Sequence, residues 1–202
     1  LKPAEQTPLS ALALAELAER AGIPAGVINI VTGMDGPAIG KTLCDDDRIR
    51  KMTFTGSTEV GRILMRQSAG TLKKMSLELG GNAPLIVFDD ADVDTAIAGT
   101  MASKYRNAGQ TCVCANRIFV QDGIYDEFAC RLTEATAAMK VGNGMEDGVE
   151  QGPIIDGQGL DKIERHVADA RAKGAEVLTG GGRHALGAVS YTHLTLPTSR
   201  SV

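Results

Sequence analysis

Apolar residues recur at helical and strand-like spacings along most of the chain, and these spacings predict its elements. Between Thr7 and Ala21, leucines and alanines follow a helical spacing, with Pro8 near the start and Gly22 just past the end. This punctuation predicts a helix. The short apolar run over 27–31 has the length of a strand. Further strands are predicted over 49–54 and 73–79, and helices over 37–44 and from near Gly56 to 70.

The same alternation resumes after Gly81. A buried strand is predicted over 84–90, followed by a helix over 93–105 for which Asp92 is the expected N-cap. Strands are then predicted over 117–121 and 175–181, helices over 125–139 and 160–173, and a glycine-rich connection over 141–153. Alternating strands and helices predict an α/β fold with a largely parallel sheet. The turn at Gly80 and Gly81 is a reasonable domain boundary.

Composition argues against several classes of protein. The 202 residues carry a net charge of −4 and only 3% aromatic residues, which argues against nucleic-acid binding. We expect no membrane span, because no apolar run approaches about 18 residues, and no signal peptide, because the pattern of a charged n-region followed by an apolar h-region is lacking. The four cysteines form no disulfide framework and are expected to be reduced thiols of a cytoplasmic protein.

The two ends of the chain suggest an internal fragment. Leu1 is not an initiator Met, and residues 189–202 lack acidic residues and the periodicity of the preceding sequence. This last stretch resembles translated adaptor DNA. We therefore expect 189–202 to be a non-native tail and exclude it from the fold prediction.

The segment "FTGSTEVG" (54–61) has two interpretations. A strand that ends at Phe54 and a helix that starts soon after would leave unpaired backbone N–H groups suited to a phosphate, with Ser57 as a further donor. Alternatively, these residues only cap the helix, with Glu59 completing a capping box from Gly56. A G-x-G-x-x-G fingerprint, which would favour a nucleotide site, is absent from this region.

Glu78 ends an otherwise apolar strand in "LELGG" (77–81). It is either a solvated edge charge or a general base whose pKa is raised by partial burial. The residues alone leave both alternatives open.

The thiols of "NAGQTCVC" (107–114) are the other candidates for chemistry. A turn before Cys112 could open a helix, whose N-terminal dipoles would lower the pKa of this thiol and favour a nucleophile. A structural thiol is the alternative, and it is the expectation for Cys44 and Cys130. No metal site is expected, because the Cys-x-Cys spacing is tight and the histidines do not cluster.

Taken together, these segments resemble the aldehyde dehydrogenase superfamily. The matching stretches are "KPAEQTP", "FTGSTEVGR", "LELGGNAP" and "NAGQTC", in that order, and the similarity covers about residues 1 to 187. The nearest subgroup is the succinate-semialdehyde dehydrogenases, of which "KYRNAGQTCVCANR" is typical. The resemblance implies part of a Rossmann-like NAD(P)-binding domain over 1–79, followed by part of an α/β catalytic domain over 80–188.

The resemblance also implies roles for individual residues. Cys112 matches the catalytic nucleophile of the family and Glu78 its general base. Arg106 matches a residue that holds the substrate carboxylate, and Cys114 a thiol that forms a reversible disulfide with the nucleophile in some members. The residues that match cofactor contacts are Lys2, Glu5, Gly33, Phe54, Thr55, Gly56, Ser57, Val60 and Leu79.

The implied reaction is the oxidation of an aldehyde, succinate semialdehyde in the first instance, through a cysteine thiohemiacetal and thioester with hydride transfer to NAD(P). Glu5 at the ribose favours NAD, with NADP as the alternative. Two other interpretations stay open: a dehydrogenase of another aldehyde, in which Arg106 forms a structural salt bridge, and a non-catalytic member. We expect the full-length protein to be a homodimer or homotetramer, and the fragment to be inactive because the family's oxyanion-hole Asn lies upstream.

Overall fold

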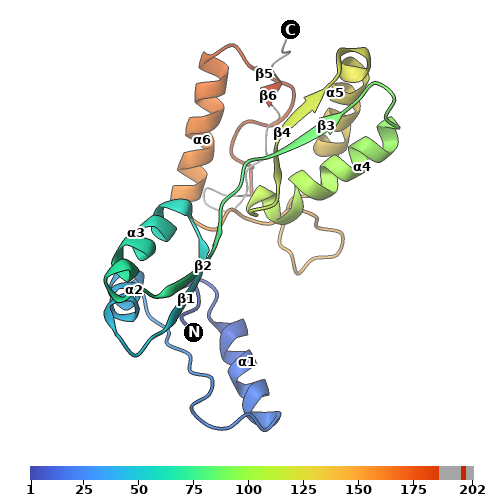
Figure 1. Cartoon of the computed structure of the whole chain (residues 1–202). Coiled ribbons are helices and arrows are strands. Elements are labelled where there is room, and N and C mark those ends of the chain that lie inside the picture. Colours follow the sequence, from blue (N-terminus) through green and yellow to red (C-terminus); the bar gives the residue numbers. More distant parts are fainter. Residues whose placement is uncertain (187–196, 199–202) are drawn as a thin grey trace. The chain divides into compact units, whose positions relative to one another are not determined.

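The computed structural model describes residues 1–186 and 197–198 (Figure 1). The chain divides into two compact units, Leu1–Leu79 and Gly80–Val202, and each is described by itself. Apart from 197–198, the tail expected to be non-native lies outside the described residues.

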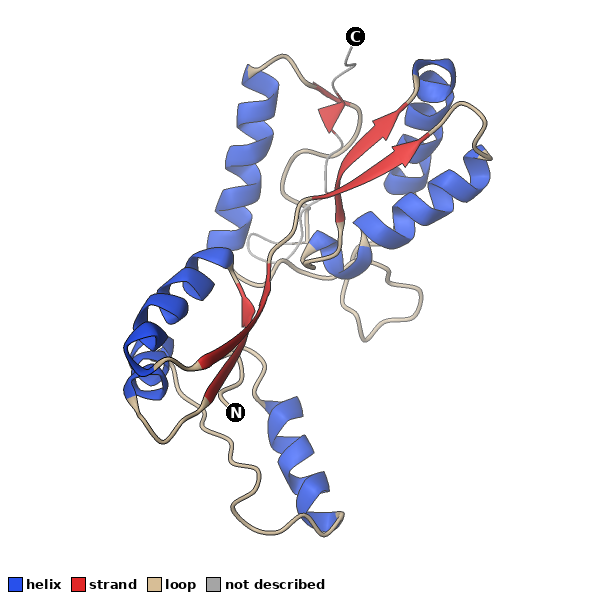
Figure 2. Cartoon of the chain, in the orientation of Figure 1, coloured by secondary structure: helices blue, strands red, loops and turns tan. Residues whose placement is uncertain are grey.

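The first unit contains a pair of parallel strands with helices packed beside it. Its elements are α1 (Leu9–Arg20), α2 (Gly36–Asp45), β1 (Lys51–Gly56), α3 (Thr58–Ser68), η1 (Ala69–Thr71) and β2 (Lys74–Leu79). β1 and β2 run in parallel, with Thr55 opposite Glu78 and Gly56 opposite Leu79. α3 contacts both strands and packs against α2 (Figure 2), where Cys44 and Leu64 are buried.

The second unit repeats this plan with its own pair of parallel strands. Its elements are β3 (Ala83–Val87), α4 (Val93–Lys104), η2 (Arg106–Gly109), β4 (Ala115–Val120), α5 (Asp122–Ala137), α6 (Gly157–Ala172), β5 (Glu176–Val177) and β6 (Pro197–Thr198). β3 pairs with β4, and α4 packs against α5. The core between them contains Val87, Phe128 and Leu132. These parallel pairs and their helices confirm the predicted α/β class.

Short polar side chains explain where several helices begin. The expected N-cap of α4 is confirmed, because the Asp92 carboxylate accepts a hydrogen bond of 2.8 Å from the Thr95 N–H. Asp35 caps α2 and Asp156 caps α6 in the same way. The capping box from Gly56 to Glu59 is wrong: the N-cap of α3 is Ser57, whose Oγ accepts from the Val60 N–H at 3.2 Å.

The strand predicted over 27–31 is also wrong. Among the described residues, the strand-like pairing of this segment is with Leu1, whose amino group donates to the Asn29 carbonyl and whose own carbonyl accepts from the Val31 N–H. Pro3 has no N–H to extend such a ladder, and the chain turns between Ala4 and Thr7. The strand predicted over 175–181 shrinks to Glu176–Val177.

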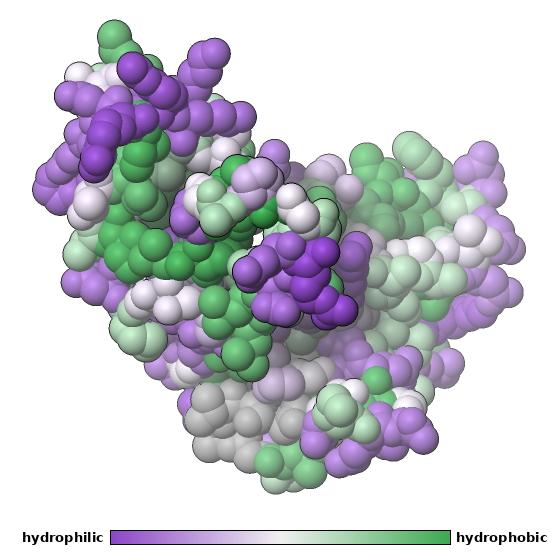
Figure 3. All heavy atoms as spheres, turned by 90° about the horizontal axis from the view of Figure 1, so that it is seen from below, coloured by the Kyte–Doolittle hydropathy of each residue, from purple (hydrophilic) through white to green (hydrophobic). Residues whose placement is uncertain are grey.

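Many large apolar side chains lie on the surface, and Figure 3 shows broad apolar areas on one face. In the first unit the exposed apolar side chains include Leu9, Leu14, Val27, Val31 and Met34, each more than half exposed. Within the described residues, no helix combines the length and hydropathy that crossing a membrane requires.

Candidate functional site

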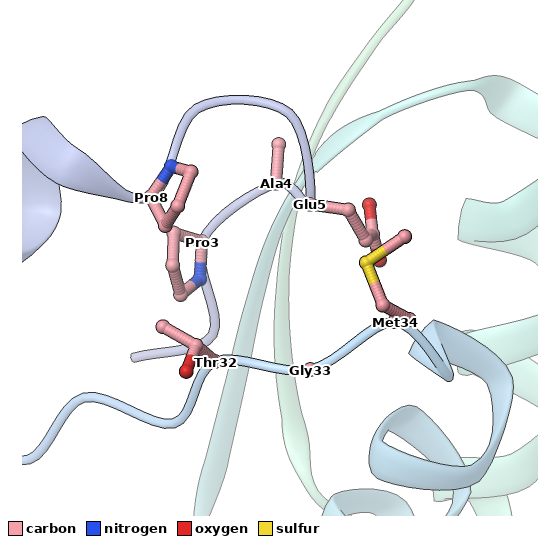
Figure 4. Close-up of a pocket in the computed structure, with 7 residues that line it drawn as sticks. All are labelled: Pro3, Ala4, Glu5, Pro8, Thr32, Gly33 and Met34. Atoms are coloured by element: carbon pink, nitrogen blue, oxygen red, sulfur yellow. The ribbon is translucent and has the colours of Figure 1, made fainter.

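A pocket of about 270 Å³ in the first unit brings together residues predicted to bind a cofactor. Glu5 and Gly33 both line it, and the segments that carry them run past each other in Figure 4. The Glu5 side chain is directed toward Met34 there. The remaining lining residues are Pro3, Ala4, Pro8, Thr32 and Met34. The structure therefore gathers at one place two predicted residues that are far apart in sequence.

Lys2 joins this group through an ion pair and hydrogen bond to Glu5. The Lys2 ammonium holds the pKa of the Glu5 carboxyl below its ordinary value. The pair lies against Gly36, the first residue of α2, where an added Cβ would be 3.1 Å from Glu5 Oε1. The carboxylate that lines the pocket is therefore paired with an ammonium, near the N-terminus of α2.

The other predicted cofactor residues lie at the carboxyl ends of β1 and β2. Phe54, Thr55 and Gly56 end β1, and Ser57 and Val60 begin α3. An added Cβ at Gly56 would be 2.4 Å from the Phe54 ring, so a side chain at Gly56 would displace that ring. Leu79 ends β2 and packs on Gly61 of α3. In open parallel sheets, ligands bind at such carboxyl ends.

Glu78 is the next-to-last residue of β2 and its side chain is exposed. The partial burial required by one of the two alternatives is therefore not present within the described part of the chain. Glu78 is therefore exposed to solvent near the end of the strand, as in the first of the two alternatives.

Cys112 lies in a turn between η2 and β4, and it is exposed. The expected helix after this thiol is wrong, because the chain continues into β4, whose residues pair with β3. Before the turn, Asn107 and Ala108 both have φ of 56° and Gly109 has φ of 77°. Left-handed conformations of non-glycine residues are strained and are found disproportionately at functional sites.

Gly81 approaches the backbone of Cys112 closely. An added Cβ at Gly81 would stand 2.5 Å from the Cys112 carbonyl oxygen, closer than side chains tolerate. Nearby, the Asn116 amide donates to the Gly81 carbonyl at 3.1 Å and Arg117 donates to the Asn82 carbonyl at 2.8 Å. Asn116 is the extra residue where the β3–β4 register shifts. These contacts hold the turn of Cys112 against the start of β3.

Cys114 has a different environment from Cys112. It is fully buried, its Sγ lies 2.7 Å from Thr111 Oγ1, and it donates weakly to the Lys104 carbonyl at 3.7 Å. Both thiols are free. The reversible disulfide between them stays a prediction, and forming it would require Cys114 to leave these partners.

Arg106 begins η2 and its side chain is exposed. Its guanidinium has no ion-pair partner within the described residues, so the structural salt bridge considered above has no support there. The preceding Tyr105 is buried, which raises the pKa of its phenol, and its hydroxyl accepts a hydrogen bond from Thr136. Tyr105 thus anchors the end of α4 from which Arg106 projects.

Sequence reasoning missed the residues that tie this turn to other segments. They are Gly81 and Asn116, described above, and Gln110 and Gln151, whose side chains donate to the carbonyls of Pro153 and Tyr105. The only available signal for Gln110 was its place two residues before Cys112. The contact and hydrogen-bond partners of these residues are distant in sequence, so no local sequence pattern identifies them. The described residues contain no group of three or more His, Cys, Asp or Glu side chains suited to a metal ion.

Comparison with known proteins identifies the family. Residues 1–195 match the model of the aldehyde dehydrogenase family. The chain is 60% identical over 191 residues to glutarate-semialdehyde dehydrogenase of Pseudomonas aeruginosa, covering 95% of this chain and 39% of that protein. It is also 60% identical over 187 residues to the NADP(+) succinate-semialdehyde dehydrogenase of Escherichia coli, covering 93% and 39%.

Solved structures give the same result. An NADP-dependent enzyme of E. coli superposes with a TM-score of 0.93 at 58% identity, covering 96% of this chain and 40% of that one. Succinate-semialdehyde dehydrogenase of Burkholderia pseudomallei gives 0.90 at 57% identity, covering 97% and 39%. The chain thus spans about two fifths of the length of these relatives. The resemblance inferred from the motifs is confirmed, and the chain belongs to the aldehyde dehydrogenase family.

Proposed function

We propose that this chain carries the nucleophile, the general base and much of the cofactor groove of an NAD(P)-dependent semialdehyde dehydrogenase. Succinate semialdehyde is the substrate that we expect this enzyme to prefer. The observation that carries the proposal is the loop of residues 106–112. It presents the exposed thiol of Cys112 and, six residues earlier, an exposed Arg106 without an ion-pair partner in the described part of the chain. A thiol and a cation on one loop suit a short aldehyde with a distal carboxylate.

The proposed chemistry begins with the Cys112 thiolate adding to the aldehyde carbon, which gives a thiohemiacetal whose oxyanion accepts from the Cys112 backbone N–H. The cofactor residues named above would hold NAD(P), which would supply a hydride acceptor for this carbon, and a thioester would then remain on Cys112. Glu78 then takes a proton from water, and the resulting hydroxide hydrolyses the thioester to the carboxylate and the free thiol. Arg106 pairs with the distal carboxylate throughout and orients the chain of the substrate.

The pocket beside Glu5 and Gly33 fits the adenosine side of a dinucleotide, because it offers a carboxylate for ribose hydroxyls. That carboxylate favours NAD, as expected from the sequence. The paired Lys2 offsets its charge and would meet a 2′-phosphate, which supports use of NADP as well. Two relatives named above are NADP enzymes. The ratio of kcat/KM for the two cofactors measures the preference.

A chimera tests this proposal. In it, residues 1–186 replace the matching segment of the E. coli succinate-semialdehyde dehydrogenase, to which the chain is 60% identical. In the chimera, Cys112→Ala should lower kcat by about 10³-fold or more and Glu78→Gln by about 10²-fold or more, with NADPH formation as the measurement. Wild-type rates in Cys112→Ala would contradict the proposed nucleophile.

Arg106→Ala tests the substrate class. A charge-assisted contact is worth about 1.5–3 kcal/mol, so kcat/KM for succinate semialdehyde should fall about 10- to 100-fold. The value for butanal, which has the same number of carbons and no carboxylate, should change less than about threefold. Equal losses for the two aldehydes would favour the alternative of an uncharged substrate. Cytoplasmic location and a homodimeric or homotetrameric assembly remain predictions.

A further inference from the structure

We propose that Gln110 is a positioning residue for Cys112, because its side-chain amide ties the loop of the thiol to residues 153–155. The inference rests on the proposed function, since it matters for the reaction only if Cys112 is the nucleophile. It assigns a role to a side chain that touches neither aldehyde nor cofactor in the proposed chemistry.

The amide of Gln110 makes hydrogen bonds with both of its ends. Nε2 donates to the Pro153 carbonyl at 3.3 Å and to the Asn107 carbonyl at 3.1 Å. Oε1 accepts from the Ile155 N–H at 3.0 Å. A carbonyl and an N–H two residues apart are what an extended segment offers to a neighbouring strand. The Gln110 side chain therefore takes the place of a strand partner and fastens the loop to a segment more than forty residues away.

The loop needs such a tie because its conformation is strained. Asn107 and Ala108 are left-handed, as is Gly109, and strained backbone persists only where its surroundings hold it. The start of the loop is fixed by Tyr105, whose carbonyl accepts from Gln151 Nε2 at 2.7 Å. Its end is fixed by the buried Cys114. Between these anchors, Gln110 supplies the side-chain bonds nearest to Cys112 that reach another segment.

Because Gln110 is exposed, its proposed role in positioning Cys112 can be distinguished from a role in global stability. Gln110 is exposed, and exposed hydrogen bonds contribute little to global stability because water replaces them. A shift of the thiol by about 1 Å, in contrast, can cost about 100-fold in rate. Loss of the amide should therefore lower the rate far more than the melting temperature.

The test uses the chimera with Gln110→Ala and Gln110→Glu, the latter keeping the shape but losing the donor. Gln121→Ala is the matched control. Gln121 is an exposed glutamine whose Oε1 accepts from the Asp89 N–H at 2.7 Å, at the opposite end of β4. Both Gln110 variants should lower kcat about 10-fold or more and change the KM for aldehyde less than about twofold. Melting temperatures should match that of the control, whose kcat should equal wild type.

A second readout does not depend on turnover. Alkylation of Cys112 by iodoacetamide, followed by peptide mass spectrometry, should change at least about threefold in rate in the Gln110 variants. Cys130, which is also exposed, serves as the internal reference. Equal alkylation rates together with an unchanged kcat, or a loss confined to the melting temperature, would overturn the inference. Failure of the proposed function is distinct, because it would appear as an inactive wild-type chimera or an active Cys112→Ala variant.

Discussion

At the scale of single residues, the position of the Cys112 thiol depends on the absence of a Cβ atom at Gly81. Gly81 has no Cβ, and this lets the Cys112 carbonyl lie against it. Gly80 is adjacent in sequence, yet an added Cβ there meets nothing within 4 Å. Two neighbouring glycines therefore have different structural requirements.

We expect Gly81→Ala to displace the Cys112 carbonyl and, with it, the thiol. In the chimera, kcat should fall about 10- to 100-fold, because reacting atoms must be placed within a fraction of an ångström. Gly80→Ala is the control and should keep kcat within about twofold. The measurement is steady-state NADPH formation. Similar rates for the two variants would show that the close approach has no catalytic consequence.

At the scale of elements, the first unit depends on a buried ammonium as well as on its strands. Lys73 precedes β2 and is 8% exposed. Its Nζ donates to the Asp46 carbonyl at 2.6 Å and to the Ile49 carbonyl at 3.0 Å. These carbonyls lie in the connection from α2 to β1, so Lys73 fastens that connection beside the parallel pair.

Lys73→Met should therefore destabilise the first unit. The variant keeps the apolar stem but leaves two carbonyls without their donor, at a cost of about 2–3 kcal/mol. Thermal unfolding of the chimera is the measurement, and the midpoint should fall by several degrees. Lys74→Met, at the exposed neighbouring position, should change stability by less than about 0.5 kcal/mol. A Lys73 variant as stable as the Lys74 variant would contradict this role.

At the scale of the whole chain, many large apolar side chains are exposed within the part that the structure describes. The chain spans about two fifths of its relatives, and side chains such as Leu9, Val27 and Met34 are exposed. Apolar areas of this kind are normally covered by other protein surface.

The 202-residue chain by itself should consequently be inactive and poorly packed. We expect no detectable NADH or NADPH formation, together with strong binding of the dye ANS, which reports exposed apolar surface. The chimera should bind much less dye and turn over substrate. Production of NADH by the purified chain would disprove the expectation.

Most helices and strands were predictable because their signals are local. Caps such as Asp92, glycine turns and apolar spacing act over a few residues, and the described elements follow them closely. The strand predicted over 27–31 was an exception, because a strand forms only where another segment supplies its backbone hydrogen bonds. The candidate residues were likewise found by motif, since the motifs keep their order along the chain.

Residue identity was enough to specify the α/β class, most element positions and the family to which this chain belongs. Packing alone decided that Cys112 precedes a strand instead of opening a helix, and that Glu78 is exposed. It also decided which distant groups contact the loop of Cys112, from Gly81 just before β3 to the carbonyl of Pro153 that Gln110 reaches. The reason is physical: periodicity and capping act between neighbours in sequence, whereas exposure and close approach arise only when separate segments pack together.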